Sequence, residues 1–289
     1  MKHIVVVDGG ASRCRLAAFS RDGELLARAE IEAHASLTMG AGMAWQHIIQ
    51  GLSLLRQSLK EKSTWQPGVL CMGLAGALQE QRRDEFLALV PQGVKALLHT
   101  DGYAQLIGAT GGQPGICLAV GTGSVMHWQD GGGGQGMAGG WGFPVGDQGS
   151  GAWLGMRVLQ IYVAHCDGDV SDSLLIKSVE QRVGSSVSDI QRWTTENRSS
   201  VLAQLAPLIF ESAAEGDTQG LALIDEAVSH CMELVRLAPD SLPVYVVGGV
   251  GTQISPALSV ALGNRLQRSC GDALRGLWHL AVASGSGSE

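Results

Sequence analysis

Apolar and polar positions divide the chain into two stretches that begin in the same way. Ile4–Val7 predicts a buried strand, and Arg15–Ser20 and Glu24–Ile31 predict two more, joined by a turn at Arg21-Asp22-Gly23. Ile116–Val120 again predicts a buried strand, which ends in a Gly/Thr/Ser turn and continues into Val125–Trp128. The pattern therefore predicts two similar halves.

After the opening strands of each half, the spacing of apolar residues predicts further helices and strands. Trp45, Ile48, Leu52, Leu55 and Leu59 recur at helical spacing, and the first half as a whole predicts the order βββαβαβα. Its other elements are strands at Val69–Leu74 and Ala96–Thr100 and helices near Gln79–Val90 and Tyr103–Ile107. The second half predicts a strand at Val244–Val247 and helices near Ala152–His165, Leu174–Val183, Leu221–Leu237 and Ala273–Val282.

The segment Gly112–Gly115 lies within the sequence GGQPG (residues 111–115). Its glycines and proline favour a turn, and it shows neither helical nor strand periodicity. We place a domain boundary there, with an N-terminal domain at 1–114 and a C-terminal domain at 115–289. The expected class is α/β, and two similar halves imply a cleft between them.

Charge and cysteine content exclude several functions. The net charge of −7 argues against nucleic-acid and anionic-membrane partners, because both require a broad positive field. The 6 cysteines are scattered singly, without the spacing of a zinc site, which is typical of a reduced protein. The first strand begins within a few residues and no apolar run approaches the ~18 residues of a membrane span, so we expect a soluble, cytoplasmic protein.

Asp8 is the first candidate for chemistry, because it ends a buried strand where an unpaired charge would be costly. The turns that follow at Asp8–Cys14 and Gly121–Ser124 aim backbone N–H groups and short hydroxyls at one point, which suits phosphate oxygens. Each turn alone is better explained as a simple hairpin. Two such turns opening two halves, with Gly248-Gly249 after another strand, favour a nucleotide held between the domains.

Several segments carry a family resemblance along nearly the whole chain. They are VDGGASRC, GLAGA at Gly73–Ala77, TDGYAQLIGA at Thr100–Ala109, GICLAVGTGS at Gly115–Ser124, GGWGFPVGDQGSGAWLG at Gly139–Gly155, VVGGVG at Val246–Gly251 and GDALRGL at Gly271–Leu277. In order and spacing they resemble N-acetylglucosamine and glucosamine kinases with a BadF/BadG/BcrA/BcrD-type ATPase domain, within the superfamily of actin, hexokinase and the heat-shock chaperone ATPases. The resemblance implies two ribonuclease H-like, actin-like ATPase domains, each with a central mixed sheet flanked by helices.

The resemblance implies that VDGGASRC is the first phosphate loop. Asp8 would lie near Mg²⁺, and Gly9, Gly10, Ser12 and Arg13 would contact the phosphates of ATP. The loop departs from the usual G-G-G-T-K-T: Ala11, Ser12, Arg13 and Cys14 replace the last four residues, and Ala11 would be strained at a positive φ. Arg13 as a solvated surface cation is the alternative.

Asp101 matches the catalytic base of the family, which accepts the proton of the sugar 6-hydroxyl. Without the resemblance, an Asp-Gly pair after a strand is more often a turn former. Ser36 stands where these kinases often have an asparagine that holds sugar hydroxyls, and is a weaker substitute.

The second half would supply the remaining contacts. Thr122 and Ser124 would donate to phosphate, with Gly121 and Gly123 allowing close approach, and Gly248 and Gly249 would lie against adenosine or simply begin a helix. The sugar would contact Gly140, Trp141, Gly142 and Asp147. Trp141 as core packing and Asp147 as a helix N-cap remain alternatives.

The sequence therefore predicts an ATP- and Mg²⁺-dependent kinase that phosphorylates the 6-hydroxyl of N-acetylglucosamine or glucosamine. The two sugars are not distinguished: GDQGSGA is more similar to the glucosamine enzymes, and GGWG to the N-acetylglucosamine enzymes. Two other classes stay open, a sugar-sensing regulator without turnover and an activator-type ATPase with an iron–sulfur cluster. No helix-turn-helix segment supports the first and no paired cysteines support the second. A homodimer is the expected assembly.

Overall fold

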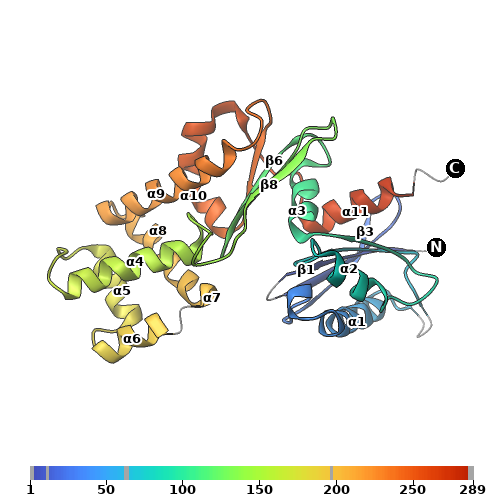
Figure 1. The fold of residues 1–289 in the computed structure, drawn as a ribbon, viewed down its shortest axis with the longest axis horizontal. Coiled ribbons are helices and arrows are strands. Elements are labelled where there is room, and N and C mark those ends of the chain that lie inside the picture. The colour runs from blue at the N-terminus through green and yellow to red at the C-terminus, as the bar shows by residue number, and fades with distance from the viewer. Residues whose placement is uncertain (1–2, 11–12, 62–64, 196–197, 286–289) are drawn as a thin grey trace. The chain divides into compact units, whose positions relative to one another are not determined.

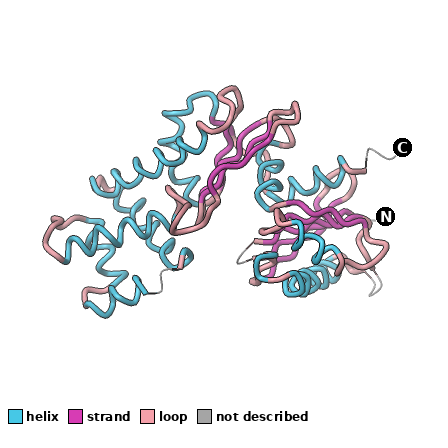
Figure 2. The backbone as a smooth tube through the Cα atoms, in the orientation of Figure 1, coloured by secondary structure: helices cyan, strands magenta, loops and turns pink. Residues whose placement is uncertain are grey.

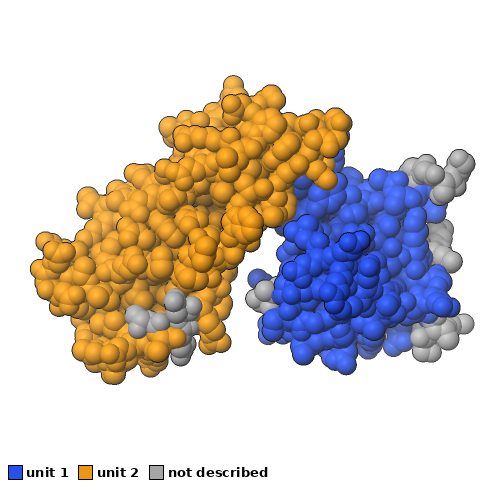
Figure 3. Space-filling model, in the orientation of Figure 1, with its two compact units in different colours: residues 1–113, 269–289 blue, residues 114–268 orange. Residues whose placement is uncertain are grey.

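The structure is a computed structural model that describes residues 3–10, 13–61, 65–195 and 198–285. It contains two compact units, coloured separately in Figure 3. Within the described residues, unit 1 comprises 1–113 and 269–289, and unit 2 comprises 114–268. The first passage of the chain between them, from Gln113 to Pro114, lies in the GGQPG segment.

The sheet of unit 1 has the order β3-β2-β1-β4-β5. β1 pairs antiparallel with β2, which pairs antiparallel with β3, whereas β1, β4 and β5 are parallel. The strands are β1 (Ile4–Gly9), β2 (Cys14–Phe19), β3 (Leu25–Ile31), β4 (Val69–Leu74) and β5 (Lys95–His99). All the strands predicted for the first half are present.

Helices cover both faces of this sheet, as the right-hand body of Figure 1 shows. Val5 and Val7 point to a core that contains Ile48 and Phe86 of the first two helices. Ile4 and Val6 point to a second core with Ala104 and Leu277 of the other two. Burial on both faces explains why the first strand is continuously apolar. The helices are α1 (Ala41–Ser58), α2 (Glu80–Leu87), α3 (Asp101–Thr110) and α11 (Ala273–Ala283), with a 3₁₀ turn η1 (Leu37–Met39).

The prediction that residues 115–289 form one domain is wrong for the last segment, because α11 belongs to unit 1. Glycines bring the backbones of α11 and α3 close together: a Cβ on Gly276 would lie 2.1 Å from the carbonyl oxygen of Ala104. Arg275 also donates from Nη1 to the carbonyl of Gly23 at 2.7 Å, with its guanidinium 4.2 Å from the ring centre of Trp278. These contacts are tertiary and leave no periodic signal.

The sheet of unit 2 repeats the topology of unit 1, with the order β10-β9-β6-β7-β8. β6, β7 and β8 form an antiparallel meander, and β9 and β10 continue from β6 in parallel. The strands are β6 (Gly115–Val120), β7 (Ser124–Gln129), β8 (Gln135–Gly139), β9 (Val244–Val247) and β10 (Leu266–Gln267). The predicted similarity of the halves is confirmed in strand order, although β8 and β10 were not predicted.

Most of unit 2 beyond its sheet is helical (Figure 2). Ile116, Leu118 and Val120 of β6 share one core with Leu154 and Leu258 from the helices. The helices are α4 (Gly151–Cys166), α5 (Leu174–Val183), α6 (Val187–Thr195), α7 (Ser199–Leu202), α8 (Ala206–Ala214), α9 (Thr218–Val235) and α10 (Gly249–Leu262), with 3₁₀ turns η2 (Ala203–Leu205) and η3 (Gly263–Arg265). Among the residues described, no helix combines the length and apolar character needed to cross a membrane.

Candidate active site

Asp8 lies on β1 directly opposite Arg15 on β2. The Asp8 side chain is 13% exposed, and its Oδ2 accepts hydrogen bonds from Nε of Arg15 at 3.0 Å and from Nη2 of the same guanidinium. A charge-assisted pair of this kind offsets the cost of placing a carboxylate at the end of a buried strand. The structure therefore supplies a protein partner for Asp8 that the sequence analysis missed.

Two further carboxylates act on Asp8 or respond to it. Asp101 is the first residue of α3, after the N-cap Thr100, and its Oδ1 accepts from the backbone N–H of Gly102 at 2.9 Å. Asp272 is the N-cap of α11. Burial raises the pKa of Asp8 and Asp272 raises it further, while Arg15 lowers it. Burial also raises the pKa of Asp101, and the charge of Asp8 adds to that shift. These carboxyl groups therefore share one electrostatic environment.

The loops around Asp8 are connected through their backbones. The N–H of Ala75 donates to Gly9 O at 3.1 Å, and the N–H of Ala35 donates to Gly10 O at 3.1 Å. A Cβ on Gly9 would lie 2.6 Å from Leu74 and 2.7 Å from Ala35, so only glycine fits there. The end of β1 is thus held against the segments that follow β3 and β4.

The remaining first-loop predictions have mixed outcomes. Ser12, and the departure at Ala11, lie outside the described residues. Arg13 is 69% exposed and pairs with Glu30 at 3.5 Å, so in this structure its charge is turned to the surface. Its contact with phosphate stays a prediction.

Ser36 is 2% exposed, and its hydroxyl is already engaged. Its Oγ lies 2.7 Å from Thr38 Oγ1, accepts from the Thr38 N–H at 3.2 Å as the N-cap of η1, and donates to the carbonyl of Ala75 at 3.3 Å. Thr38, its hydroxyl partner, is exposed as a residue. Direct contact of Ser36 with a sugar stays a prediction, and the geometry gives Ser36 a structural part in ordering the loop.

In unit 2 the turn Gly121–Ser124 is held by neutral groups and one carboxylate. The N–H of Gly121 donates to Gly123 O at 2.9 Å, and Ser124 Oγ donates to the carbonyl of Gln148 at 2.9 Å. Thr122 is exposed, whereas Ser124 is buried. The N–H of Gly151, at the start of α4, donates to Gly121 O at 2.8 Å. Of the two predicted phosphate hydroxyls, therefore, only that of Thr122 is open to solvent.

Asp147 reaches this same turn. Its Oδ1 accepts from the N–H of Ser124 at 3.3 Å, and a Cβ on Gly123 would lie 2.7 Å from its Oδ2. Its backbone has a φ of 66°, a left-handed conformation that is unusual outside glycine. The N-cap of α4 is Ser150, so the alternative interpretation of Asp147 as that cap is wrong.

Trp141 is 81% exposed, which excludes core packing as its role in this structure. Its neighbours Gly140 and Gly142 have φ values of 71° and 85°, conformations that glycine adopts readily. The predicted sugar loop is therefore a surface loop of unit 2 with an open indole.

Gly248 and Gly249 lie beside the phosphate turn of unit 2. Gly248 has a φ of 94°, and a Cβ there would lie 2.3 Å from Val120 O. Gly249 begins α10, so the pair is also a helix entry. Unit 2 thus gathers Gly121–Ser124, Asp147 and Gly248, and unit 1 gathers Asp8, Gly9, Gly10 and Asp101.

Arg15 and Asp272 are the residues that sequence reasoning missed. Antiparallel pairing across the turn after Gly9 places Asp8 opposite Arg15, so the register carried a signal for Arg15. Asp272 had only the weak signal of an acidic residue before an apolar helix.

Known proteins match this chain over most of its length. The model of the BadF/BadG/BcrA/BcrD ATPase family matches residues 5–252. Glucosamine kinase GspK of Vibrio cholerae is 26% identical over 96% of this chain and 94% of its own. N-acetyl-D-glucosamine kinase of Dictyostelium discoideum is 27% identical over 80% of this chain and 77% of its own.

A crystal structure from Chromobacterium violaceum, provisionally named an N-acetylglucosamine kinase, is 35% identical with a TM-score of 0.89 over 97% of this chain and 99% of its own. The match and the repeated strand order assign the fold to actin-like ATPases with two ribonuclease H-like domains. The chain belongs to the BadF/BadG/BcrA/BcrD ATPase family.

Proposed function

We propose that this protein is an ATP-dependent amino-sugar kinase that transfers the γ-phosphate to the 6-hydroxyl of glucosamine or N-acetylglucosamine. The single observation that carries the proposal is the placement of Asp101. It begins α3 in the electrostatic field of Asp8, in a chain whose relatives over nearly full length are named glucosamine and N-acetylglucosamine kinases.

Asp101 is the proposed base. Its hydrogen bond from the Gly102 N–H fixes one carboxylate oxygen, which orients the group toward an incoming hydroxyl. Because burial raises its pKa, the carboxylate accepts a proton more readily than a solvated aspartate. Its role is to take the proton of the 6-hydroxyl as that oxygen attacks phosphorus.

The residues around Asp8 fit a Mg²⁺ ion held largely through water. Arg15 occupies Oδ2, which leaves Oδ1 for the ion. In the described part of the chain there is no cluster of three or more His, Cys, Asp or Glu side chains suited to a metal, and Mg²⁺ characteristically uses one or two carboxylates with nucleotide phosphates and water. When bound, the ion would neutralise charge on the β and γ phosphates.

The turn of unit 2 is the proposed second phosphate contact. Its exposed Thr122 hydroxyl and backbone N–H groups donate to phosphate, and Gly248-Gly249 at the start of α10 gives adenosine room against the backbone. The proposed reaction requires both units to bind the same nucleotide. Gly140, Trp141, Gly142 and Asp147 remain the proposed sugar contacts of unit 2, with Ser36 and its neighbour Thr38 in unit 1.

A requirement for Mg²⁺, a homodimer and a cytoplasmic location stay predictions from the sequence. A sugar sensor without turnover and an activator-type ATPase remain the alternatives. An absorbance spectrum of freshly purified protein separates the second alternative, because bound iron and a brown colour would favour the activator.

A coupled ADP-release assay tests the proposal with glucose, glucosamine, N-acetylglucosamine and mannosamine as acceptors. We expect turnover that depends on an amino sugar and falls by about 10²–10⁴-fold in Asp101→Asn. Thermal unfolding of the variant checks that it is folded. ATP hydrolysis that is independent of every sugar and unchanged by the substitution would overturn both the reaction and the base.

A further inference from the structure

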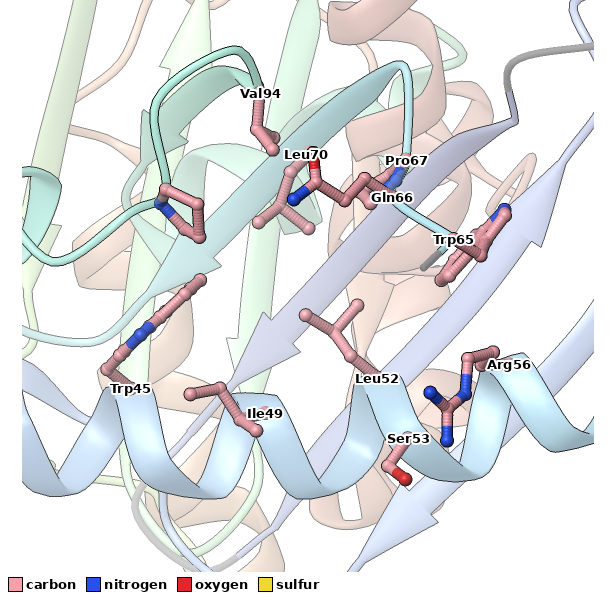
Figure 4. A pocket seen from close by; sticks show the side chains of 11 residues that line it. Trp45, Ile49, Leu52, Ser53, Arg56, Trp65, Gln66, Pro67, Leu70 and Val94 are labelled. Atoms are coloured by element: carbon pink, nitrogen blue, oxygen red, sulfur yellow. The ribbon is translucent and has the colours of Figure 1, made fainter. Parts of the chain in front are cut away.

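Unit 1 contains an apolar groove at the end of its sheet that is remote from the carboxylates. It lies between α1, the segment before β4 and the turn before β5, and encloses about 330 Å³ (Figure 4). Val94 borders it just before β5, whereas Asp101 follows the other end of that strand. At ~3.3 Å per residue the two positions are about 20 Å apart. None of the proposed kinase residues lines the groove.

Two indole rings mark the ends of the groove. Figure 4 shows Trp45 at one end and Trp65 at the other, with Ile49 and Leu52 on the α1 side between them. Trp45 packs edge-to-face on Phe86 at 5.8 Å between ring centres, and the ring of Trp65 lies 6.1 Å from that of His3. Because both indoles already pack against other rings, ligand binding would cost little additional side-chain entropy.

The groove leaves apolar surface in water. Ile49 is 48% exposed although its neighbours in the groove are carbon-rich, and Leu52 and Val94 are only partly buried against the core beneath. A flat hydrophobic ligand between the two indoles would remove this surface from water, and aromatic rings add stacking to that burial.

Polar groups in the groove are few. Arg56, one turn beyond Leu52 on α1, brings a guanidinium to the end of the groove where Figure 4 shows Trp65, and Ser53 lies beside it on the same helix. Gln66 contributes an amide from the opposite wall. A guanidinium with the Ser53 hydroxyl beside it, at one end of an apolar slot, suits a carboxylate on an aromatic body. The nearly all-carbon remainder suits neither a sugar nor a phosphate.

We propose that this groove is a binding site for a small planar aromatic carboxylate. The aromatic body lies between Trp45 and Trp65 over Ile49 and Leu52, and the carboxylate faces Arg56. The volume is at the lower end of the range for small-molecule pockets, which limits the ligand to about two fused rings.

Titration calorimetry with 2-naphthoate tests the proposal, with 2-naphthamide as the neutral analogue. We expect 2-naphthoate to bind the full chain with a Kd below about 1 mM, as ~13 non-hydrogen atoms allow. Arg56→Gln is expected to weaken 2-naphthoate by about tenfold and to change 2-naphthamide by less than about twofold.

A variant that fills the groove tests whether the ligand binds there. Ile49→Trp places an indole in the groove and is expected to abolish binding of both compounds, whereas Leu54→Trp on the same helix, outside the groove lining, is expected to leave binding unchanged. Melting temperatures of both variants check folding. No saturable binding, binding that survives Ile49→Trp, or equal weakening of the two compounds by Arg56→Gln would each overturn the proposal.

Discussion

The turn after the first strand is built differently in the two units, although their sheets have the same strand order. In unit 1, Asp8 is paired with Arg15, and the charges of Asp101 and Asp272 act on the same region. In unit 2, the turn is held by backbone hydrogen bonds and by the Ser124 hydroxyl, with Asp147 as its carboxylate. The same fold therefore has a charged turn in unit 1 and a nearly neutral turn in unit 2.

This difference matches a division of labour in phosphoryl transfer. The proposed base and the proposed cation site both require carboxylates with shifted pKa values, and burial and neighbouring charges raise the pKa values of Asp8 and Asp101 in unit 1. The proposed phosphate contact requires small residues that let the backbone approach, and unit 2 has Gly121 and Gly123 in its turn. Substitutions confined to one unit test whether this difference between the two turns is real.

The largest effect on stability is expected from Gly248→Ala in unit 2. Its new Cβ would lie 2.3 Å from Val120 O at a φ of 94°, and neither the backbone nor the angle adjusts easily. We expect a loss of about 3 kcal/mol in the free energy of unfolding, measured by urea denaturation. Gly249→Ala is the matched control, because nothing lies within 4 Å of its Cβ position. Equal losses in the two variants would contradict this explanation.

The next effect tests the charged half. Arg15→Gln leaves the Asp8 carboxylate without its counter-ion, and we expect a loss of about 2 kcal/mol at about pH 8, reduced from the fully buried case because Arg15 is 38% exposed. The loss is expected to shrink as the pH falls through the raised pKa of Asp8, since a protonated carboxyl needs no counter-ion. Urea denaturation at about pH 8 and about pH 4 measures the loss of stability and its dependence on pH.

Arg13→Gln is the control for this pair. Its side chain is 69% exposed, so a change below about 0.5 kcal/mol is expected at either pH. If the two arginine variants lose the same stability, the Asp8 contact is not what distinguishes unit 1.

A smaller effect concerns the hairpin that follows each turn. In unit 1 the hairpin at Gly23 is held by Arg275 from α11, whereas in unit 2 Asp130 accepts from the N–H groups of Gly132 and Gly134 within its own loop. Arg275→Ala is expected to cost about 1–2 kcal/mol through the lost hydrogen bond and ring contact. Differential scanning calorimetry compares it with Arg21→Ala, an exposed arginine in the same hairpin.

The smallest expected effect is an increase in thermal stability. The pKa of Asp101 is raised in the folded state, so the ionised carboxylate favours unfolding. The contribution of Asp101 to the stability of the wild type therefore decreases as the pH rises from the pKa of the unfolded state through that of the folded state. Asp101→Asn cannot ionise. We expect its melting temperature to exceed that of the wild type by a few degrees at neutral pH and to match it in acid. A variant that is less stable than the wild type at neutral pH would contradict this.

Much of the fold could be predicted from local patterns. The apolar run at Ile4–Val7 and the Asp22-Gly23 turn indicated their elements directly, because strand period and turn chemistry are local properties. The start of helix α10 was predicted only as an alternative role of Gly248-Gly249, and its extent was missed because Gly249, Gly251 and Pro256 all weaken a helical pattern. Strand β8 was missed because Gly136 and Gly139 resemble a loop.

The candidate site was predictable to the level of its motifs. Asp8 and Asp101 follow predicted strands, and their surroundings required the tertiary structure. That Ser36 Oγ is already bonded, that Asp147 reaches Ser124 and that Asp272 acts on Asp8 all depend on contacts between distant segments. No spacing along the sequence reports such contacts.

The return of the chain to unit 1 at Ser269 affects the order of events on the ribosome. Residues 114–268 form a continuous unit that can fold as soon as it emerges, whereas unit 1, whose synthesis begins first, lacks α11 until residues 273–283 have been added. Until then, the surface of β1 and α3 that α11 covers is exposed, with Ala104 among its residues. Unit 1, which carries the proposed base, is thus completed only after the whole of unit 2 has been synthesised.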